Sequence, residues 1–465
     1  MLRTLRLMAY VCLPIFTLWL SSLWAPAAYG GGALVLYVDK DATGGAGIGT
    51  SWANAYTTLQ GALDMTNANN TTAFEIWMAE GVYYPDEGGS HVADAQSESF
   101  HILYNNVQMY GGFAATETLR TQRIPSVNLT ILSGDIDGND TNTDGNSIAE
   151  TYADIQGSNA YHVLYLDGQT NEALTTATVL DGFIVTAGSA TSSKEDSKGG
   201  GLYCAGTSSG NGCSPTVAQV TFSGNKAGSG GGMFNNGFSD GISSPALTNV
   251  TFAGNKAVDG GGMANDGYGG VSSPVLTNVT FTGNTADLGG GIFCSGYTGT
   301  SSPVLTNVTF NGNRAFVYGG GMFNSGDSGV SSPVLTNVTF GGNMAVSGGG
   351  MYNSATNFGT SSPQLVNVIM WGNSANYSAE IYNSGATPSI TYSDIDQDGI
   401  SGTGNIRQDP LFVAPVSAGS APTSSGNYHI RPGSPAADTG TGTGCPATDL
   451  DGFTRPLDGN GDGSA

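Results

Sequence analysis

The sequence predicts an all-β fold, a parallel β-helix in which each coil of about 30 residues contributes three short strands. A motif close to Ser-Pro-x-Leu-x-Asn-Val-Thr-Phe-x-Gly-Asn recurs six times within residues 199–395, at steps of 29 or 30 residues. The motif consists of strand and turn residues, and a fixed period of this kind is typical of a solenoid. Glycine accounts for 73 of the 465 residues, about twice the usual share, which suits a fold with many corners.

The second copy shows how one repeat is expected to fold. Val250 and Phe252 alternate with Thr251, so they share one face of a strand. Leu247 has the wrong parity for that face if the strand runs straight. Because Asn tolerates the left-handed backbone, we expect a corner at Asn249 between two short strands. A third strand follows the Gly-Gly-Gly run, whose glycines allow corners where side chains of neighbouring coils would collide.

Stacked coils place equivalent residues above one another, about 4.8 Å apart. The expected interior file of phenylalanines is Phe222, Phe252, Phe281, Phe310 and Phe340. The expected file of asparagines is Asn225, Asn255, Asn284, Asn313, Asn343 and Asn373. Stacked amides can hydrogen-bond from coil to coil, so we interpret these asparagines as structural. The alternatives are that they are attachment sites for glycans or that they bind a ligand.

Residues 1–27 are predicted to be a secretory signal peptide. Arg3 and Arg6 precede an apolar run, and small residues suitable for cleavage follow at 25–27. A retained membrane anchor is the alternative, because the apolar run from Leu7 to Trp24 is close to the length that spans a bilayer.

Residues 28–198 are expected to form less regular coils. A short amphipathic helix from Ala53 to Met65 is predicted to cap the open end of the column. Three short motifs in this region resemble the start of many secreted bacterial β-helix proteins. They are Tyr37-Val-Asp39, Gly49-Thr-Ser-Trp52 and Ala79-Glu-Gly-Val-Tyr83.

The regular repeats, residues 199–395, resemble a known family. Phe-x-Gly-Asn followed by Gly-Gly-Gly-Met is similar to the paired motifs of chlamydial polymorphic outer-membrane protein repeats. The resemblance implies a right-handed parallel β-helix of the pectin-lyase-like class, displayed at a bacterial cell surface or outer membrane. The last copy departs from the pattern, because Ser378-Ala-Glu-Ile381 replaces its glycine run.

Residues 396–465 lose the period. The segments Asn405–Phe412, Tyr428–Ala436 and Thr448–Gly452 resemble the choice-of-anchor Q region, which precedes surface anchors in secreted bacterial β-helix proteins. Relatives would continue with a further strand and an anchor, so we expect this region to be incomplete.

The charge balance narrows the range of partners. The chain has 36 acidic and 13 basic residues, a formal net charge of −23. Such a surface repels nucleic acid and anionic lipid. We therefore expect extracellular glycans or surface proteins as partners, no nucleic acid, and contact with a membrane only through export or through an anchor missing from this chain.

Two groups of residues are candidates for chemistry that stabilises the fold. Cys204 and Cys213 flank a short loop and form a candidate disulfide, since their spacing fits no zinc motif. Two acidic loops resemble the first half of a calcium-binding loop, which makes Ca²⁺ the one cofactor to consider, with solvated acidic turns as the alternative. The weak calcium candidates are Asp140, Asn142, Asp144, Asp394, Asp396 and Asp398.

Two classes of function remain open. A non-catalytic adhesin-like or structural surface is favoured, because the acids of the regular coils are scattered and no catalytic residues are predicted. A polysaccharide lyase or glycoside hydrolase is the alternative, since parallel β-helices often act on polysaccharides. A glycosidase needs two carboxyls about 5 Å or about 6.5–9.5 Å apart on a concave face. Close acids beside an Arg in a groove would favour the enzyme, and a flat Thr/Ser/Asn face would favour the binder.

Overall fold

The computed structural model describes residues 32–455 except 193 and 443, so the predicted signal peptide lies outside the described residues. The described residues from Ala33 to Arg455 belong to one compact unit. No helix among the described residues has the length and apolar character needed to cross a bilayer.

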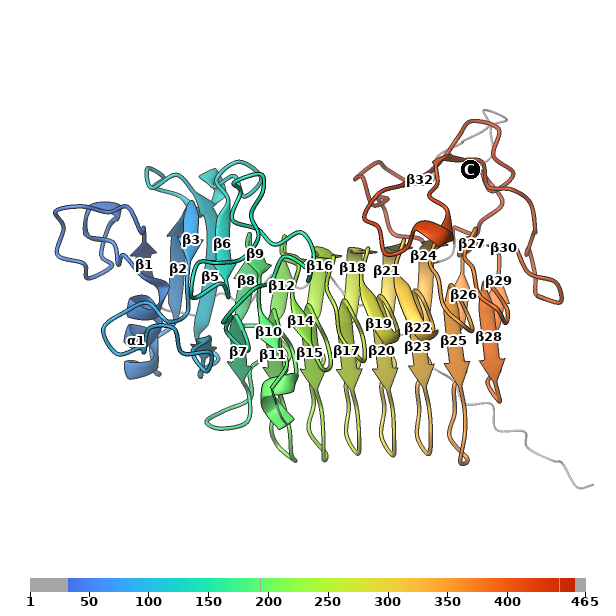
Figure 1. Cartoon of the computed structure of the whole chain (residues 1–465), viewed down its shortest axis with the longest axis horizontal. Helices are drawn as coiled ribbons and strands as arrows, with labels where there is room; N and C mark the ends of the chain where they lie inside the picture. The colour runs from blue at the N-terminus through green and yellow to red at the C-terminus, as the bar shows by residue number, and fades with distance from the viewer. Residues whose placement is uncertain (1–31, 193, 443, 456–465) are drawn as a thin grey trace, which may run out of the picture. The chain divides into compact units, whose positions relative to one another are not determined.

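Two long sheets of parallel strands run side by side along the column of coils (Figure 1). The sheet with 17 strands consists of β1 (Leu34–Val38), β2 (Phe74–Ala79), β3 (Gly81–Tyr83), β5 (Val107–Phe113), β6 (Thr130–Ser133), β8 (Val179–Asp181), β9 (Ile184–Thr186), β12 (Thr216–Ala218), β13 (Thr221–Ser223), β16 (Ala246–Ala253), β18 (Val275–Thr282), β21 (Val304–Asn311), β24 (Val334–Gly341), β26 (Gln364–Val366), β27 (Ile369–Trp371), β29 (Ser389–Thr391) and β30 (Asp394–Ile395). The sheet with nine strands consists of β4 (Phe100–Ile102), β7 (Leu164–Asp167), β11 (Leu202–Ala205), β15 (Met233–Asn236), β17 (Met263–Asp266), β20 (Ile292–Ser295), β23 (Met322–Ser325), β25 (Met351–Ser354) and β28 (Ile381–Ser384). The predicted class, a right-handed parallel β-helix, is confirmed.

Shorter strands and helices lie outside the two long sheets. The remaining strands pair as β10 (Ser189–Ala190) with β14 (Lys226–Ala227), β19 (Thr285–Leu288) with β22 (Arg314–Tyr318), and β31 (Phe412–Ala414) with β32 (Asn427–Ile430). The described helices are α1 (Leu59–Ala68) and the 3₁₀ turns η1 (Trp52–Asn54), η2 (Arg120–Gln122), η3 (Lys194–Ser197) and η4 (Ala418–Ser420).

The predicted Asn corner is a bend inside one sheet. Asn249, Asn278 and Asn307 have left-handed φ values of 55°, 56° and 54°. In the middle coils, however, the strand continues through the bend, so β16, β18, β21 and β24 each span eight residues. The two expected strands stay in one sheet because both halves pair with the same neighbouring coil. The bend turns Leu247 to the same side of the sheet as Val250 and Phe252. All three side chains are therefore buried.

The interior files are stacked in register. Successive Phe rings from Phe222 to Phe340 lie 4.9, 4.8, 4.9 and 4.5 Å apart and nearly parallel. All five side chains are fully buried. The glycine runs permit this spacing: a Cβ on Gly261 would lie 2.5 Å from the carbonyl oxygen of Gly290 in the next coil.

The asparagine file from Asn225 to Asn373 forms a continuous hydrogen-bonded ladder. In each step the Nδ2 of one Asn donates to the Oδ1 of the next at 2.8–3.0 Å. The same oxygen also accepts the backbone N–H of the preceding Asn. From Asn255 onward, the second N–H of each side chain reaches the carbonyl of a Phe one coil back, such as Phe222 for Asn255. Each buried amide is thereby satisfied by groups that recur in every coil.

Glu380 ends this ladder. Its carboxylate accepts both the backbone N–H and the side-chain Nδ2 of Asn373, taking the place of a seventh Asn. The side chain is 1% exposed. Burial raises the pKa of Glu380 to about 7. The Ser378–Ile381 departure from the repeat pattern is therefore the point at which the ladder stops.

The N-terminal helix begins later than predicted. The expected helix at Ala53–Met65 is instead a 3₁₀ turn, η1, followed by α1 from Leu59. Thr58 starts α1 because its side chain accepts the N–H of Gly61 at 3.3 Å. α1 lies beside β1 at the blue end of the column, and its Leu59 and Leu63 join the core (Figure 1).

The C-terminal region packs against the corners of the last regular coils. Thr423 donates its N–H to the carbonyl of Gly312 at 3.0 Å. A Cβ on Gly341 would lie 2.0 Å from the ring of Tyr428, so the glycine leaves room for that ring. Residues 409–455 are thus attached along the column as well as at its end.

Candidate binding face

The outer surface of the 17-stranded sheet carries repeated columns of Thr and Asn. The alternation that buries Val250 and Phe252 turns Thr251 outward. We call the surface made by these columns over β16, β18, β21 and β24 the Thr/Asn face. Its residues are Thr248, Thr277, Thr306 and Thr336, Asn249, Asn278, Asn307 and Asn337, and Thr251, Thr280, Thr309 and Thr339. A neighbouring column is apolar, since Val275 and Val304 are 46% and 39% exposed.

Hydrogen bonds hold the asparagines of the face in place. Asn278 Nδ2 donates to Asn249 Oδ1 at 3.0 Å, and Asn307 Nδ2 donates to Asn278 Oδ1 at 3.0 Å. Their left-handed backbone and their position between two paired strand halves restrict them further. The face is therefore a preorganised array, and a ligand that binds it loses little free energy to ordering of the protein.

The C-terminal region contacts the later part of the face. The carbonyl of Thr448 accepts Asn307 Nδ2 at 3.0 Å, and Arg455 donates to Asn307 Oδ1 at 3.2 Å. Further along the column, Asn367 Nδ2 donates to the carbonyl of Thr441 at 2.9 Å. Asn249, in contrast, is exposed. The earlier coils therefore offer the more accessible part of the Thr/Asn face.

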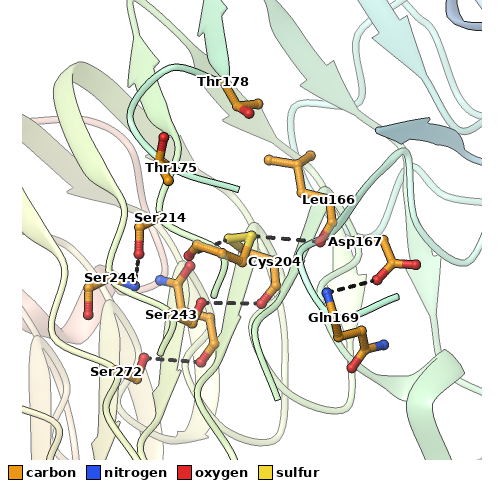
Figure 2. The surroundings of a disulfide bond; sticks show 12 residues. Leu166, Asp167, Gln169, Thr175, Thr178, Cys204, Ser214, Ser243, Ser244 and Ser272 are labelled. Carbon is orange, nitrogen blue, oxygen red and sulfur yellow. Dashed lines mark hydrogen bonds between the residues drawn. A yellow bond between two sulfur atoms is a disulfide. The ribbon is translucent and has the colours of Figure 1, made fainter. Parts of the chain in front are cut away.

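Cys204 and Cys213 are joined by a disulfide whose Cα atoms lie 5.5 Å apart. Figure 2 shows Cys204 beside Leu166 of the previous coil and Ser243 of the next. Ser243 Oγ donates to the carbonyl of Cys204 at 3.2 Å. The bridge closes the loop of the first regular coil. Cys294 is a buried free thiol in the interior, and burial raises its pKa to about 12, which makes it unreactive.

Removing the disulfide is expected to destabilise the chain moderately. The bridge joins cysteines nine positions apart, and closing a loop of that size contributes about 2.5 kcal/mol through the unfolded state. We expect the free energy of unfolding of the Cys204→Ser/Cys213→Ser double variant to be lower by that amount. Its urea midpoint should therefore be lower than that of the native chain. Reducing agent should produce the same loss in the native chain and none in the variant. Equal urea midpoints for both proteins would contradict the prediction.

The first group of calcium candidates does not share a common partner. Asp140 accepts the N–H of Gln156 and an amide N–H of Asn159, whereas Asp144 binds Asn146. Asn142 accepts the N–H of Ser147 at 3.3 Å. Burial raises the pKa of Asp140 to about 6, with smaller contributions from neighbouring acids.

In the second group, two of the three acids pair with one arginine. Asp396 accepts Arg407 Nε at 3.0 Å, and Asp398 also pairs with Arg407. Asp394 is buried, accepts the N–H of Gln408 at 3.0 Å, and has its pKa raised by burial. Over residues 32–455, apart from the two gaps, no three His, Cys, Asp or Glu side chains lie close enough to hold a metal. Calcium binding by either group therefore stays a prediction.

Titratable side chains gather near the N-terminal end instead. A cleft of about 590 Å³ there is lined by residues that include Lys40, Tyr84, Asp86, Glu87 and His91. Burial and the neighbouring Asp86 raise the pKa of Glu87. Sequence inspection missed this cleft because its residues lie in the irregular coils, where no period aligns them.

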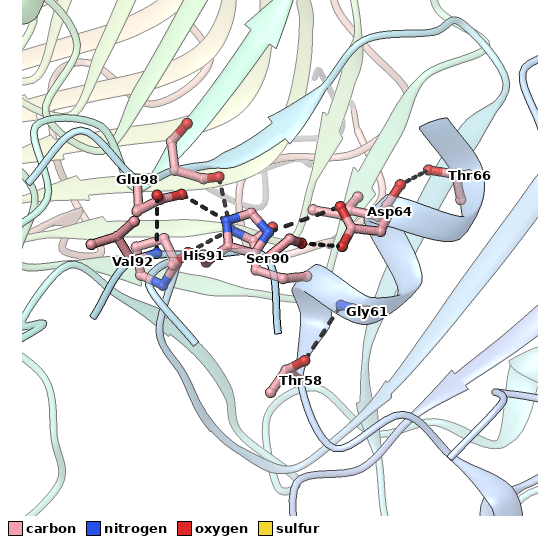
Figure 3. Close-up of polar contacts among 12 residues, drawn as sticks. Thr58, Gly61, Asp64, Thr66, Ser90, His91, Val92 and Glu98 are labelled. Carbon is pink, nitrogen blue, oxygen red and sulfur yellow. Dashed lines mark hydrogen bonds and ion pairs between the residues drawn. The ribbon is translucent and has the colours of Figure 1, made fainter. Parts of the chain in front are cut away.

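The His91 cluster at this cleft is arranged for support rather than nucleophilic attack. Figure 3 shows His91 between Asp64 of α1 and Glu98, with its Nδ1 2.6 Å from Glu98 Oε2 and its Nε2 3.9 Å from Asp64 Oδ1. Ser90 Oγ donates to Asp64 Oδ2 at 2.8 Å. A serine nucleophile needs its hydroxyl on the base, so this Ser is not activated by the His.

The comparisons with known proteins leave the activity open. Residues 278–295, within one coil, match the Chlamydia polymorphic membrane protein repeat. No curated protein matches the chain. Among solved structures, the crystal structure of pectate lyase Pel9A is similar at 13% identity over 91% of this chain and 96% of that chain, with a TM-score of 0.39. That score is too low for any role of the pectate lyase to be transferred.

Proposed function

We propose that this chain is a secreted or cell-surface bacterial β-helix protein that binds an extended ligand without catalysis, through the Thr/Asn face. The observation that carries the proposal is the repetition of Thr and Asn columns over four consecutive coils, at the spacing of the Phe rings. Hydroxyl and amide groups both donate and accept hydrogen bonds, which suits the hydroxyls of a glycan. A ligand with repeating units can meet equivalent groups on successive coils.

Three further features support a place outside the cell. The Cys204–Cys213 disulfide is of the kind that persists in oxidising compartments. The net charge of −23 keeps such a protein soluble and away from nucleic acid. The matched polymorphic membrane protein repeat is consistent with display on a bacterial surface.

A glycan array probed with the purified chain tests the proposal. We expect binding to at least one glycan, weakened at least tenfold by Thr248→Arg and Thr277→Arg, which place bulky side chains on the accessible part of the face. Thr71→Arg, an exposed threonine in the turn after α1, is the matched control and should bind normally. No binding to any glycan, or equal loss in the control, would count against the Thr/Asn face.

The same glycans should be incubated with the chain and assayed for reducing ends and for unsaturated products. We expect neither, because no catalytic pair of carboxyls lies on the Thr/Asn face. Product from any polysaccharide would favour the alternative, a lyase or hydrolase. Loss of that product in Glu87→Gln would then place the chemistry in the N-terminal cleft.

A further inference from the structure

Three aromatic side chains form an exposed row at the loops that follow β15, β17 and β20. These loops extend beyond the arrowheads of the three strands in Figure 1. The rings of Phe238 and Tyr268 lie 5.1 Å apart, and those of Tyr268 and Tyr297 lie 4.9 Å apart. The three side chains are 44%, 43% and 37% exposed. We call Phe238, Tyr268 and Tyr297 the aromatic row.

The row is local and rigid. The equivalent loop positions in the coils before and after it are Thr207 and Asp327, so the rings occupy three coils only. Backbone hydrogen bonds join the loops, with Ser239 donating to the carbonyl of Tyr268 at 2.8 Å and Gly269 donating to that of Tyr297 at 3.0 Å. The rings are therefore held at the coil spacing before any ligand arrives.

Packing of the fold does not explain the row. The interior Phe file has its rings fully buried, whereas these rings leave more than a third of their surface in water. Ile242 and Val271, on the same loops, are also 48% and 36% exposed. A contiguous exposed apolar patch of this kind marks a binding site more often than a scattered apolar residue does.

The chemistry of the loops indicates which ligand fits. The two Tyr hydroxyls supply donors and acceptors beside apolar rings, a combination suited to a ligand that is apolar on one side and polar on the other. Residues 206–215, 237–245, 267–274, 296–303 and 326–333 contain no Lys, Arg or His, and they carry the acids Asp240 and Asp327. A polyanion such as a uronic acid polymer would meet repulsion there without a compensating cation.

We propose that the aromatic row binds an uncharged polysaccharide whose chain runs along the axis of the coils. Sugar rings present apolar C–H faces and polar hydroxyl edges, which match the rings and hydroxyls of the row. The inference rests on the proposed function and adds to it the ligand class and a second contact, away from the Thr/Asn face.

The test measures binding of the full chain to soluble β-glucan, mannan and chitin oligosaccharides, with polygalacturonate and polylysine as charged probes. We expect Tyr268→Ala to weaken binding to at least one neutral glycan about tenfold or more, and Tyr268→Phe to weaken it less. Phe358→Ala, which removes an isolated exposed ring from a later loop, is the matched control and should leave binding unchanged. Because Tyr268 is exposed, the melting temperature should stay close to that of the native chain, which separates lost binding from lost folding.

The outcomes distinguish this inference from the proposed function. Neutral glycan binding that Thr277→Arg weakens and Tyr268→Ala does not would overturn the aromatic row and leave the proposed function intact. Binding to polylysine alone would identify a cationic protein partner and overturn the row as a glycan site. Binding to none of the probes would overturn both.

Discussion

Replacing Asn284 with Ala is expected to destabilise the chain by about 5 kcal/mol, a large part of the roughly 5–15 kcal/mol by which a folded domain is stable. Asn284 Oδ1 accepts two N–H groups of Asn255, and its Nδ2 donates to the carbonyl of Phe252 at 2.9 Å. All of these groups are buried, and alanine would leave three of them without a partner. Each unsatisfied buried group costs about 1–3 kcal/mol.

Asn278→Ala provides the matched control for this prediction. It removes an Asn from the same coil, but from the outer Thr/Asn face, where water can replace the lost amide. Its left-handed backbone makes alanine unfavourable by about 1–2 kcal/mol. Urea unfolding of both variants, with hydrogen exchange at the affected coils, measures the difference. Equal urea midpoints for Asn284→Ala and Asn278→Ala would show that an Asn of the interior ladder stabilises the fold no more than an Asn of the outer face.

The second large effect is a loss of stability as the pH rises, caused by Glu380. Its pKa is about 7 in the folded chain, whereas the pKa of a Glu in water, and so in the unfolded chain, is 4.5. The folded state therefore binds more protons than the unfolded state between these values, and stability falls as the pH rises from 4.5 to 7. The full loss is reached about one pH unit above the folded-state pKa. A shift of this size corresponds to about 3 kcal/mol.

Glu380→Gln removes this titration while retaining an acceptor for Asn373. We expect the native chain to lose about 3 kcal/mol relative to the variant between about pH 4.5 and about pH 8. Comparing the two proteins at each pH cancels the contribution of the other acids. Urea midpoints that change in parallel for both proteins across this range would show that ionisation of Glu380 does not lower the free energy of unfolding.

The repeats made the interior predictable. Because each copy has nearly the same length, Phe252, Phe281 and Phe310 had to fall in register once the coils stacked, and so did the ladder asparagines. The left-handed bend at Asn249 followed from the parity of Leu247 and from the tolerance of Asn for a left-handed backbone. Its place inside one continuous strand did not, because that depends on both strand halves finding partners in the same neighbouring coil.

Features that join distant or unrepeated segments could not be predicted. The contact between Asn307 and Thr448 bridges 141 positions of sequence and involves a region with no period. In the sequence, Glu380 appeared only as a departure from the repeat pattern. That it accepts hydrogen bonds from Asn373 and ends the ladder depends on how the coils stack, which only the structure shows. The spacing of Asp396 and Asp398 suggested a cation, and the cation beside them is the guanidinium of Arg407, which the loop motif does not include.

The interior ladder also has a direction. Every amide from Asn225 onward directs one side-chain N–H toward the oxygen of the following coil, so these donor–acceptor pairs align head to tail as peptide dipoles do in a helix. The far end, where the donors would otherwise be unmet, is the positive pole, and it is there that the Glu380 carboxylate lies. The column can accordingly be shortened by whole repeats between the poles, whereas a cut that removes Glu380 would expose a pole with nothing to accept its hydrogen bonds.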